Sequence, residues 1–187
     1  MALPRIYQIK VTLQGAKPPI WRRLLVPNTL SLKALHRVIQ TAMGWTDSHL
    51  HQFEAHGQNY GVPDPEYGED MLNEAQVRLD QVLIEPKEAM VYEYDFGDGW
   101  LHKVVLEKVL EPVENVVVPS CIGGKRACPP EDCGGVYGYE ELLMVMSDPS
   151  HAEYEEMRDW VGEFFDPEHF DVAKINRLLA TRTRRDS

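Results

Sequence analysis

The segment from Tyr94 to Trp100 places the strongest constraint on the fold of this chain. It reads Tyr-Asp-Phe-Gly-Asp-Gly-Trp, an acidic turn in which two glycines stand between aromatic residues. Gly97 and Gly99 allow the backbone a positive φ angle, which tight turns often require. The turn therefore predicts a hairpin of two strands, over residues 90–94 and 101–109.

The first third of the chain predicts a second hairpin followed by a helix. Residues 7–13 alternate between apolar and polar side chains, which is typical of a strand with one buried face, and residues 20–26 predict its partner. Ser31 is a candidate N-cap for an amphipathic helix that ends near Gly44. Residues 50–55 then predict a third strand.

This order of elements, a hairpin, a helix and then further strands, is that of the β-grasp folds. We therefore expect an α+β protein with a β-grasp-like mixed sheet packed by one helix. From Gly138 onward the apolar period becomes helical, and Pro149 and Pro167 separate three predicted helices. The apolar residues of the middle helix are expected to be buried: Tyr154, Met157, Trp160, Val161 and Phe164.

The whole chain, residues 1–187, is expected to form a single domain, because it is long enough for one good core. Residues 1–110 are predicted to make the β-grasp-like core. Residues 111–137 form a loop rich in cysteine, glycine and proline, and residues 138–182 form a C-terminal helical layer.

Charge and hydropathy restrict the partners of the chain. The formal net charge of -11 argues against nucleic-acid binding, which needs clustered lysine and arginine. The pair Arg22-Arg23 is interpreted as solvated surface charge on a strand. No apolar run approaches the roughly 18 residues of a membrane span, and the first residues lack the apolar core of a signal peptide. These features predict a cytoplasmic protein, and they predict no oligomeric state.

Three cysteines stand within the loop: Cys121, Cys128 and Cys133. They could bind a structural zinc ion, with His102 or His151 as the fourth ligand. The alternative is that they are free thiols packed as small apolar groups. Glu131 and Asp132 lie in the same loop as a possible carboxylate pair.

A second set of candidate residues combines histidine and aspartate: His49, His51, Asp95, Asp98 and His102. His49 and His51 lie two positions apart, so on a strand they share one face. Next to the aspartates of the turn they could form a mixed nitrogen and oxygen metal site, or an acid–base pair. The alternative is that these histidines only form hydrogen bonds with carboxylates.

Several blocks of sequence together resemble the plasmid pRiA4b open-reading-frame-three-like family, some members of which carry a transposon passenger label of the "TnpR" type. The blocks are Pro18 to Arg23, Gly44-Trp45, His49 to Phe53, Tyr94 to His102, and Cys121 with Pro129 to Gly135, extended by Gly138-Tyr139 and Asp148 to His151. The resemblance covers nearly the whole chain and implies an α+β fold, with a molecular function that is not established. The arginine-surrounded serine and basic helix of a serine resolvase are not evident.

Three functions follow as expectations. The first is a binding or adaptor module for a protein or peptide, with a zinc ion as its only possible cofactor. The second is a metal-assisted hydrolase built on the histidine and aspartate cluster. The third, which rests on the resemblance alone, is a DNA-associated accessory protein of a mobile element.

Overall fold

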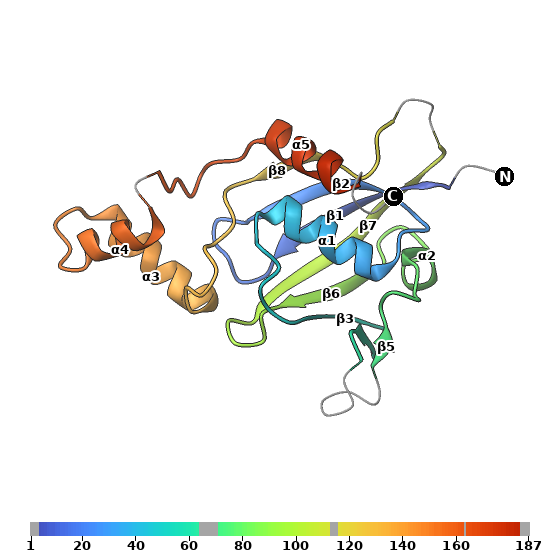
Figure 1. Ribbon diagram of the computed structural model, residues 1–187, viewed down its shortest axis with the longest axis horizontal. Helices are drawn as coiled ribbons and strands as arrows, with labels where there is room; N and C mark the ends of the chain where they lie inside the picture. Colours follow the sequence, from blue (N-terminus) through green and yellow to red (C-terminus); the bar gives the residue numbers. More distant parts are fainter. Residues whose placement is uncertain (1–3, 64–70, 113–115, 163, 184–187) are drawn as a thin grey trace.

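The structure is a computed structural model that describes residues 4–63, 71–112, 116–162 and 164–183. These residues form an eight-stranded sheet in the order β5-β4-β3-β6-β7-β1-β2-β8, together with five helices (Figure 1). Neighbouring strands are antiparallel except β4 and β5, which are parallel, so the sheet is mixed. The predicted α+β class is confirmed.

Both strands of the first hairpin are interior strands of the sheet. β1 (Ile6–Leu13) pairs with β2 (Trp21–Pro27) on one side and with β7 on the other, with Ile6 opposite Leu110. Along both strands of the hairpin buried side chains alternate with half-buried ones, as the alternation in the sequence predicts. One face of the sheet therefore faces the core.

Helix α1 (Leu32–Met43) covers that face, as Figure 1 shows. Ser31 caps its first turn, because the Ser31 hydroxyl accepts a hydrogen bond from the backbone N–H of Ala34 at 3.2 Å. Gly44 ends the helix in the left-handed conformation, with φ of 108°. Both ends of the helix are where the sequence predicts them.

Beyond α1 the chain builds the other side of the sheet. β3 (His51–Ala55) is followed by β4 (Gln58–Gly61) and β5 (Leu72–Asn73), of which only β3 was predicted. β4 and β5 are short, so their sequences show little periodic pattern. A single helical turn, α2 (Leu79–Val82), follows β5.

β6 (Ala89–Tyr94) and β7 (Trp100–Leu110) form the predicted hairpin around the acidic turn. Gly99 has a positive φ angle of 68°, but the second such residue is Asp95, at 57°, and not Gly97. The prediction for Gly97 is therefore wrong. Aspartate tolerates this conformation better than most residues, because its side chain can bond to the local backbone.

The region predicted as an irregular loop contains an edge strand, β8 (Ser120–Lys125), which pairs with β2. This part of the prediction for residues 111–137 is wrong. The strand includes two consecutive glycines, which are depleted in strands, so its sequence does not show a strand pattern.

Three helices follow: α3 (Gly135–Ser147), α4 (Tyr154–Val161) and α5 (Val172–Thr183). Figure 1 shows α5 beside α1 on the same face of the sheet, whereas α3 and α4 lie beyond one end of the sheet. No residue of α4 is buried, and Trp160 and Phe164 are 50% and 92% exposed. The predicted burial is therefore wrong for Trp160 and Phe164, whereas Met157 and Val161 are partly buried and pack against the core. α4 packs mainly on α3.

The arginine pair on β2 is not a solvated pair. Arg22 is only 2% exposed, because its position in the strand alternation points it to the core face. Arg23 points to the other face, where it forms an ion pair with Glu107 at 2.6 Å. The interpretation of Arg22 as surface charge is wrong, and the pair does not present two free cations to a phosphate backbone.

Candidate functional site

Three segments that are distant in the sequence meet at one end of the sheet. They are the loop after α1 (residues 45–50), the β6–β7 turn (residues 95–99) and residues 127–134. β3 pairs with β6, so the loop that enters β3 lies beside the turn that leaves β6, and the Asp95 N–H donates to the carbonyl of Leu50 at 2.8 Å. The indole Nε1–H of Trp45 donates to the carbonyl of Pro129 at 3.1 Å, which fastens the third segment.

Each of these segments contributes one side chain to a cluster of His49, Asp95 and Asp132, which we call the open cluster. His49 Nε2 lies 3.7 Å from Asp95 Oδ2 and 3.2 Å from Asp132 Oδ1. One ligand atom from each residue lies within 4.8 Å of the other two. The side chain of Asp132 is 72% exposed and that of Asp95 is 11% exposed, so the cluster opens to solvent on one side.

Both aspartates of the open cluster have left-handed backbone conformations, with φ of 57° at Asp95 and 58° at Asp132. Asp95 Oδ1 accepts hydrogen bonds from the N–H groups of Gly97 at 3.0 Å and Asp98 at 3.4 Å. These bonds orient the carboxylate so that Oδ2 is the oxygen nearest His49. Unusual backbone conformations held by surrounding bonds are concentrated at functional sites.

A hydrogen-bond network around Glu131 supports the open cluster. The Tyr94 hydroxyl donates to Glu131 Oε1 and accepts from the N–H of Ser48 at 3.0 Å. Thr46 donates to the same carboxylate through its hydroxyl and its backbone N–H. Burial and the Glu131 hydrogen bond raise the pKa of Tyr94 above its usual range, so this phenol stays protonated as a donor.

Asp98 belongs to the supporting structure and not to the cluster. Its Oδ2 accepts a hydrogen bond from the N–H of Gly134 at 3.2 Å, which joins the β6–β7 turn to the segment before α3. At Gly135, where φ is 69°, an added Cβ atom would lie 2.4 Å from the carbonyl oxygen of Asp98. The contact leaves no room for a side chain.

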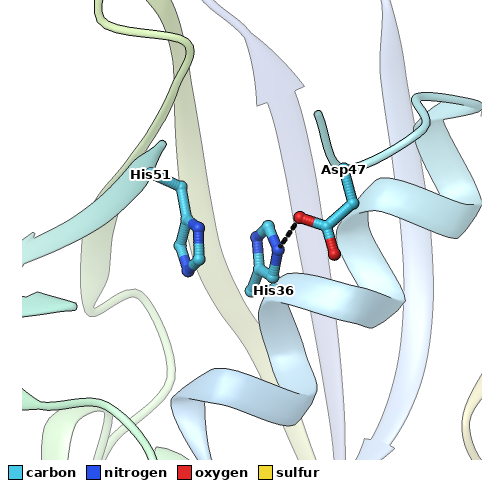
Figure 2. Close-up of side chains that lie close together, drawn as sticks. All are labelled: His36, Asp47 and His51. Atoms are coloured by element: carbon cyan, nitrogen blue, oxygen red, sulfur yellow. Dashed lines mark hydrogen bonds and ion pairs between the residues drawn. The ribbon is translucent and has the colours of Figure 1, made fainter. Parts of the chain in front are cut away.

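A second group, His36, Asp47 and His51, forms what we call the closed cluster. Figure 2 shows the His36 ring between the His51 ring and the Asp47 carboxylate. The two imidazole rings are stacked, with centroids 3.4 Å apart and an angle of 4° between their planes. His36 Nε2 lies 2.7 Å from Asp47 Oδ1, and His51 Nε2 lies 2.8 Å from an oxygen of the buried Glu74.

The protonation state of His36 follows from its surroundings. Burial and the neighbouring His51 lower the pKa of His36 to about 4, so the ring is neutral at pH 7. A neutral ring has one donor and one acceptor nitrogen. The carboxylate of Asp47 can only accept, so Nε2–H donates to it and Nδ1 accepts from the Tyr92 hydroxyl at 2.8 Å. Tyr92 in turn accepts from the side-chain amide of Gln40 at 3.0 Å.

The predicted histidines thus lie in different parts of the structure. His49 precedes β3 and joins the open cluster with Asp95, whereas His51 lies on β3 and joins the closed one. The expectation that His49 and His51 share one face of a strand is wrong. His102 is fully buried on β7, with Nδ1 3.3 Å from the carbonyl of Tyr92, and burial lowers its pKa to about 4.

The cysteines and their proposed histidine partners are not brought together. Among the described residues, neither group of three or more potential metal ligands contains a cysteine. Cys121 is buried on β8, where its thiol contacts the Gly123 carbonyl, and Cys133 contacts the Gly135 carbonyl. Burial raises the pKa values of all three thiols, that of Cys133 to about 12. His151 accepts from the Glu153 N–H at the start of α4.

Sequence reasoning missed three residues of these clusters, namely His36, Asp47 and Asp132. His36 follows Leu35 in the predicted helix, where a buried histidine shows no distinct pattern. Asp132 was considered only as a partner of Glu131. The signal that could have found it is its place in a segment rich in glycine and proline.

The open cluster has the composition of a divalent metal site. One imidazole and two carboxylates suit ions such as Zn²⁺, Mn²⁺ or Fe²⁺, and three ligands leave positions for water and substrate. Asp132 and Cys133 also line a cavity of about 320 Å³ between their segment, α3 and α4, with Glu153, Met157 and Trp160 among its other walls. The ring stack of the closed cluster is instead enclosed and hydrogen-bonded.

Comparison with known proteins places the chain among relatives without a described activity. Residues 5–174 match the family described as plasmid pRiA4b ORF-3-like protein. The uncharacterized protein y4hQ of Sinorhizobium fredii is 35% identical over 176 residues, which cover 93% of this chain and 90% of the relative. A crystal structure of a protein of unknown function from Methanosarcina mazei Go1 has a TM-score of 0.84 and 42% sequence identity, and the similarity covers 91% of this chain and 97% of that one. No helix in the described ranges combines the length and apolar character needed to cross a membrane.

Proposed function

This chain belongs to the plasmid pRiA4b ORF-3-like family, and we propose that it is a metal-assisted hydrolase whose metal ion binds at the open cluster. The observation that carries the proposal is the position of His49 Nε2, 3.7 Å from Asp95 Oδ2 and 3.2 Å from Asp132 Oδ1. Three ligands from three separate segments converge there, in a place that is accessible from solvent.

The chemistry follows from this ligand set. A divalent ion at the three ligands would lower the pKa of a bound water and polarise the oxygen of a carbonyl or phosphoryl group. The water would lose a proton and add to that group, and the departing alcohol or amine would take up a proton. We expect the rest of the substrate to bind in the cavity beside Asp132.

The first test measures metal content and affinity. We expect tag-free protein to bind Zn²⁺ or Mn²⁺ with one ion per chain in calorimetry, and His49→Ala and Asp132→Asn to weaken binding by about tenfold or more. His151→Ala is the matched control, because His151 lies outside both clusters. Binding that survives in the His49 and Asp132 variants but disappears in His51→Ala would move the metal site to the closed cluster.

The second test measures hydrolysis. Metal-loaded protein is incubated with nitrophenyl esters, phosphomonoesters and phosphodiesters and with amino-acid nitroanilides. We expect turnover of at least one class, lost on chelation and in Asp95→Asn. Metal binding without turnover of any class would contradict the hydrolase and leave a metal ion with a structural role.

The surface of α3 and α4 favours a second function, a binding module for a protein or peptide. Tyr137 and Met144 of α3, Trp160 of α4 and Phe164, which follows α4, are each at least half exposed. Exposed apolar groups that form a patch often mark binding surfaces. We expect selection from a displayed peptide library to enrich one class of apolar peptide that binds the wild type and not Trp160→Glu. Enrichment that is equal for the two proteins would contradict this function.

A further inference from the structure

A cavity of about 350 Å³ lies between β2, the end of α1 and α5, separate from the open cluster's three ligands. Its apolar wall is made by Met43, Trp45, Phe165, Phe170, Ile175 and Leu178. The guanidinium of Arg22 also lines it, although Arg22 is only 2% exposed. The cavity is therefore largely apolar with one buried cation, Arg22, and its lining also includes His169, Asp171 and Lys174.

The hydrogen bonds of Arg22 go to neutral groups. Nε donates to the carbonyl of Ala42 at 2.8 Å, and Nη1 donates to the carbonyls of Trp21 at 2.9 Å and Lys125 at 3.0 Å. The guanidinium carbon lies 5.0 Å from the centre of the Phe170 ring. In the part of the chain that the structure describes, no carboxylate pairs with Arg22 and no acceptor bonds to Nη2.

A buried charge of this kind is costly unless an opposite charge compensates for it. The carboxylates that line the cavity are already engaged. Asp171 Oδ1 accepts from the N–H of Lys174 at 2.9 Å, at the start of α5, and Glu131 accepts from Tyr94 and Thr46. Arg22 thus keeps two N–H donors and a full charge for a group from outside the chain.

We propose that this cavity binds a small organic carboxylate, with its anionic group on Nη2 of Arg22 and its apolar body against Phe165, Phe170 and Leu178. A single buried guanidinium matches one negative charge, and charge-assisted hydrogen bonds to carboxylates are strong. The nearby Asp171 and Glu131 disfavour a dianion such as phosphate. The volume lies in the range of small-ligand sites. This inference does not depend on a metal ion at the open cluster.

The test compares two carboxylates with their neutral amides and with inorganic phosphate. Binding of phenylacetate, phenylacetamide, octanoate, octanamide and inorganic phosphate is measured by calorimetry and by intrinsic tryptophan fluorescence, to which Trp45 in the cavity wall contributes. We expect each carboxylate to bind about tenfold or more tightly than its amide and more tightly than phosphate. Equal affinity for acid and amide, tighter binding of phosphate, or no binding of either carboxylate would overturn the proposal.

Variants of one strand supply the matched control. Arg22→Met is expected to abolish the preference for carboxylates, whereas Arg23→Met, on the opposite face of β2, keeps it. Leu178→Trp is designed to fill the cavity while Arg22 is kept, and it should block binding. This variant tests the proposal even when Arg22→Met does not fold. Carboxylate binding that persists in Leu178→Trp would place the site elsewhere.

Discussion

The closed and open clusters draw on the same two residue types, histidine and aspartate, and both take residues from the loop that enters β3, yet their surroundings differ. In the closed cluster both nitrogens of His36 and one of His51 are hydrogen-bonded, and the rings are stacked. In the open cluster His49 faces two carboxylates on loops, one of them exposed. The comparison teaches that residue type does not separate a stabilising histidine from a reactive one, whereas burial and satisfied partners do.

The largest effect that the comparison predicts is on stability. His36→Ala removes a buried ring from its stack, and it removes the acceptor of the Tyr92 hydroxyl and a donor to Asp47. We therefore expect a loss of about 3 kcal/mol in the free energy of unfolding. His49→Ala should cost less than about 1 kcal/mol, because His49 is partly exposed. Urea denaturation measures both, and equal losses would erase the distinction between the clusters.

The next prediction concerns pH. His36 has a pKa of about 4 in the folded protein against 6.5 ordinarily, so the unfolded chain takes up the proton first. The contribution of His36 is therefore complete above pH 6.5 and is lost as the pH falls toward 4, by about 3 kcal/mol in all.

Denaturation curves between pH 7 and pH 4 for the wild type, His36→Gln and His49→Gln measure this effect. The pH dependence should become shallower in His36→Gln, with a remainder from His102, whose pKa is also about 4. A slope that instead changes only in His49→Gln would assign the sensitivity to the open cluster.

A smaller effect is expected where the open cluster is joined to α3. Gly135→Ala places a Cβ atom against the Asp98 carbonyl, so we expect a loss of about 2 kcal/mol and weaker metal binding, as the segment carrying Asp132 moves away. Gly134 also has a positive φ angle, of 88°, but a Cβ atom added there would have room. Gly134→Ala should therefore lose about half as much stability as Gly135→Ala. A larger loss in Gly134→Ala, measured by thermal unfolding, would refute the explanation.

The smallest effect is expected at Asp132. Asp132→Gly removes the strain of a left-handed backbone conformation, which stabilises the folded state, but it also raises the conformational entropy of the unfolded chain. Because these contributions oppose each other, the free energy of unfolding should change by less than about 1 kcal/mol. Metal affinity should still fall, as in Asp132→Asn. A large loss of stability in urea would show that Asp132 supports the fold rather than the site.

Much of the fold could be predicted from the sequence, because periodic patterns and caps are local. The two hairpins, and α1 with Ser31 and Gly44 at its ends, follow from such signals. β8 could not be found, since its glycines carry no strand pattern, and the exposure of α4 depends on what α4 packs against.

The candidate site was predicted only in part, for a related reason. His49 and Asp95 were named, because the turn and the histidine pair are conspicuous in the sequence. Their joining with Asp132 depends on the pairing of β3 with β6 and on the Trp45 hydrogen bond to Pro129, which are contacts between distant segments. No spacing along the chain contains that information.

The interior position of the first hairpin in the sheet has a consequence for synthesis on the ribosome. β1 and β2 are made before their outer neighbours β7 and β8, which follow roughly a hundred residues later in the chain. At about 5–20 residues per second, the emerging hairpin waits for several seconds with both edges unpaired. During that interval it is open to pairing with other nascent chains, so crowding of ribosomes on one message should promote aggregation of this protein.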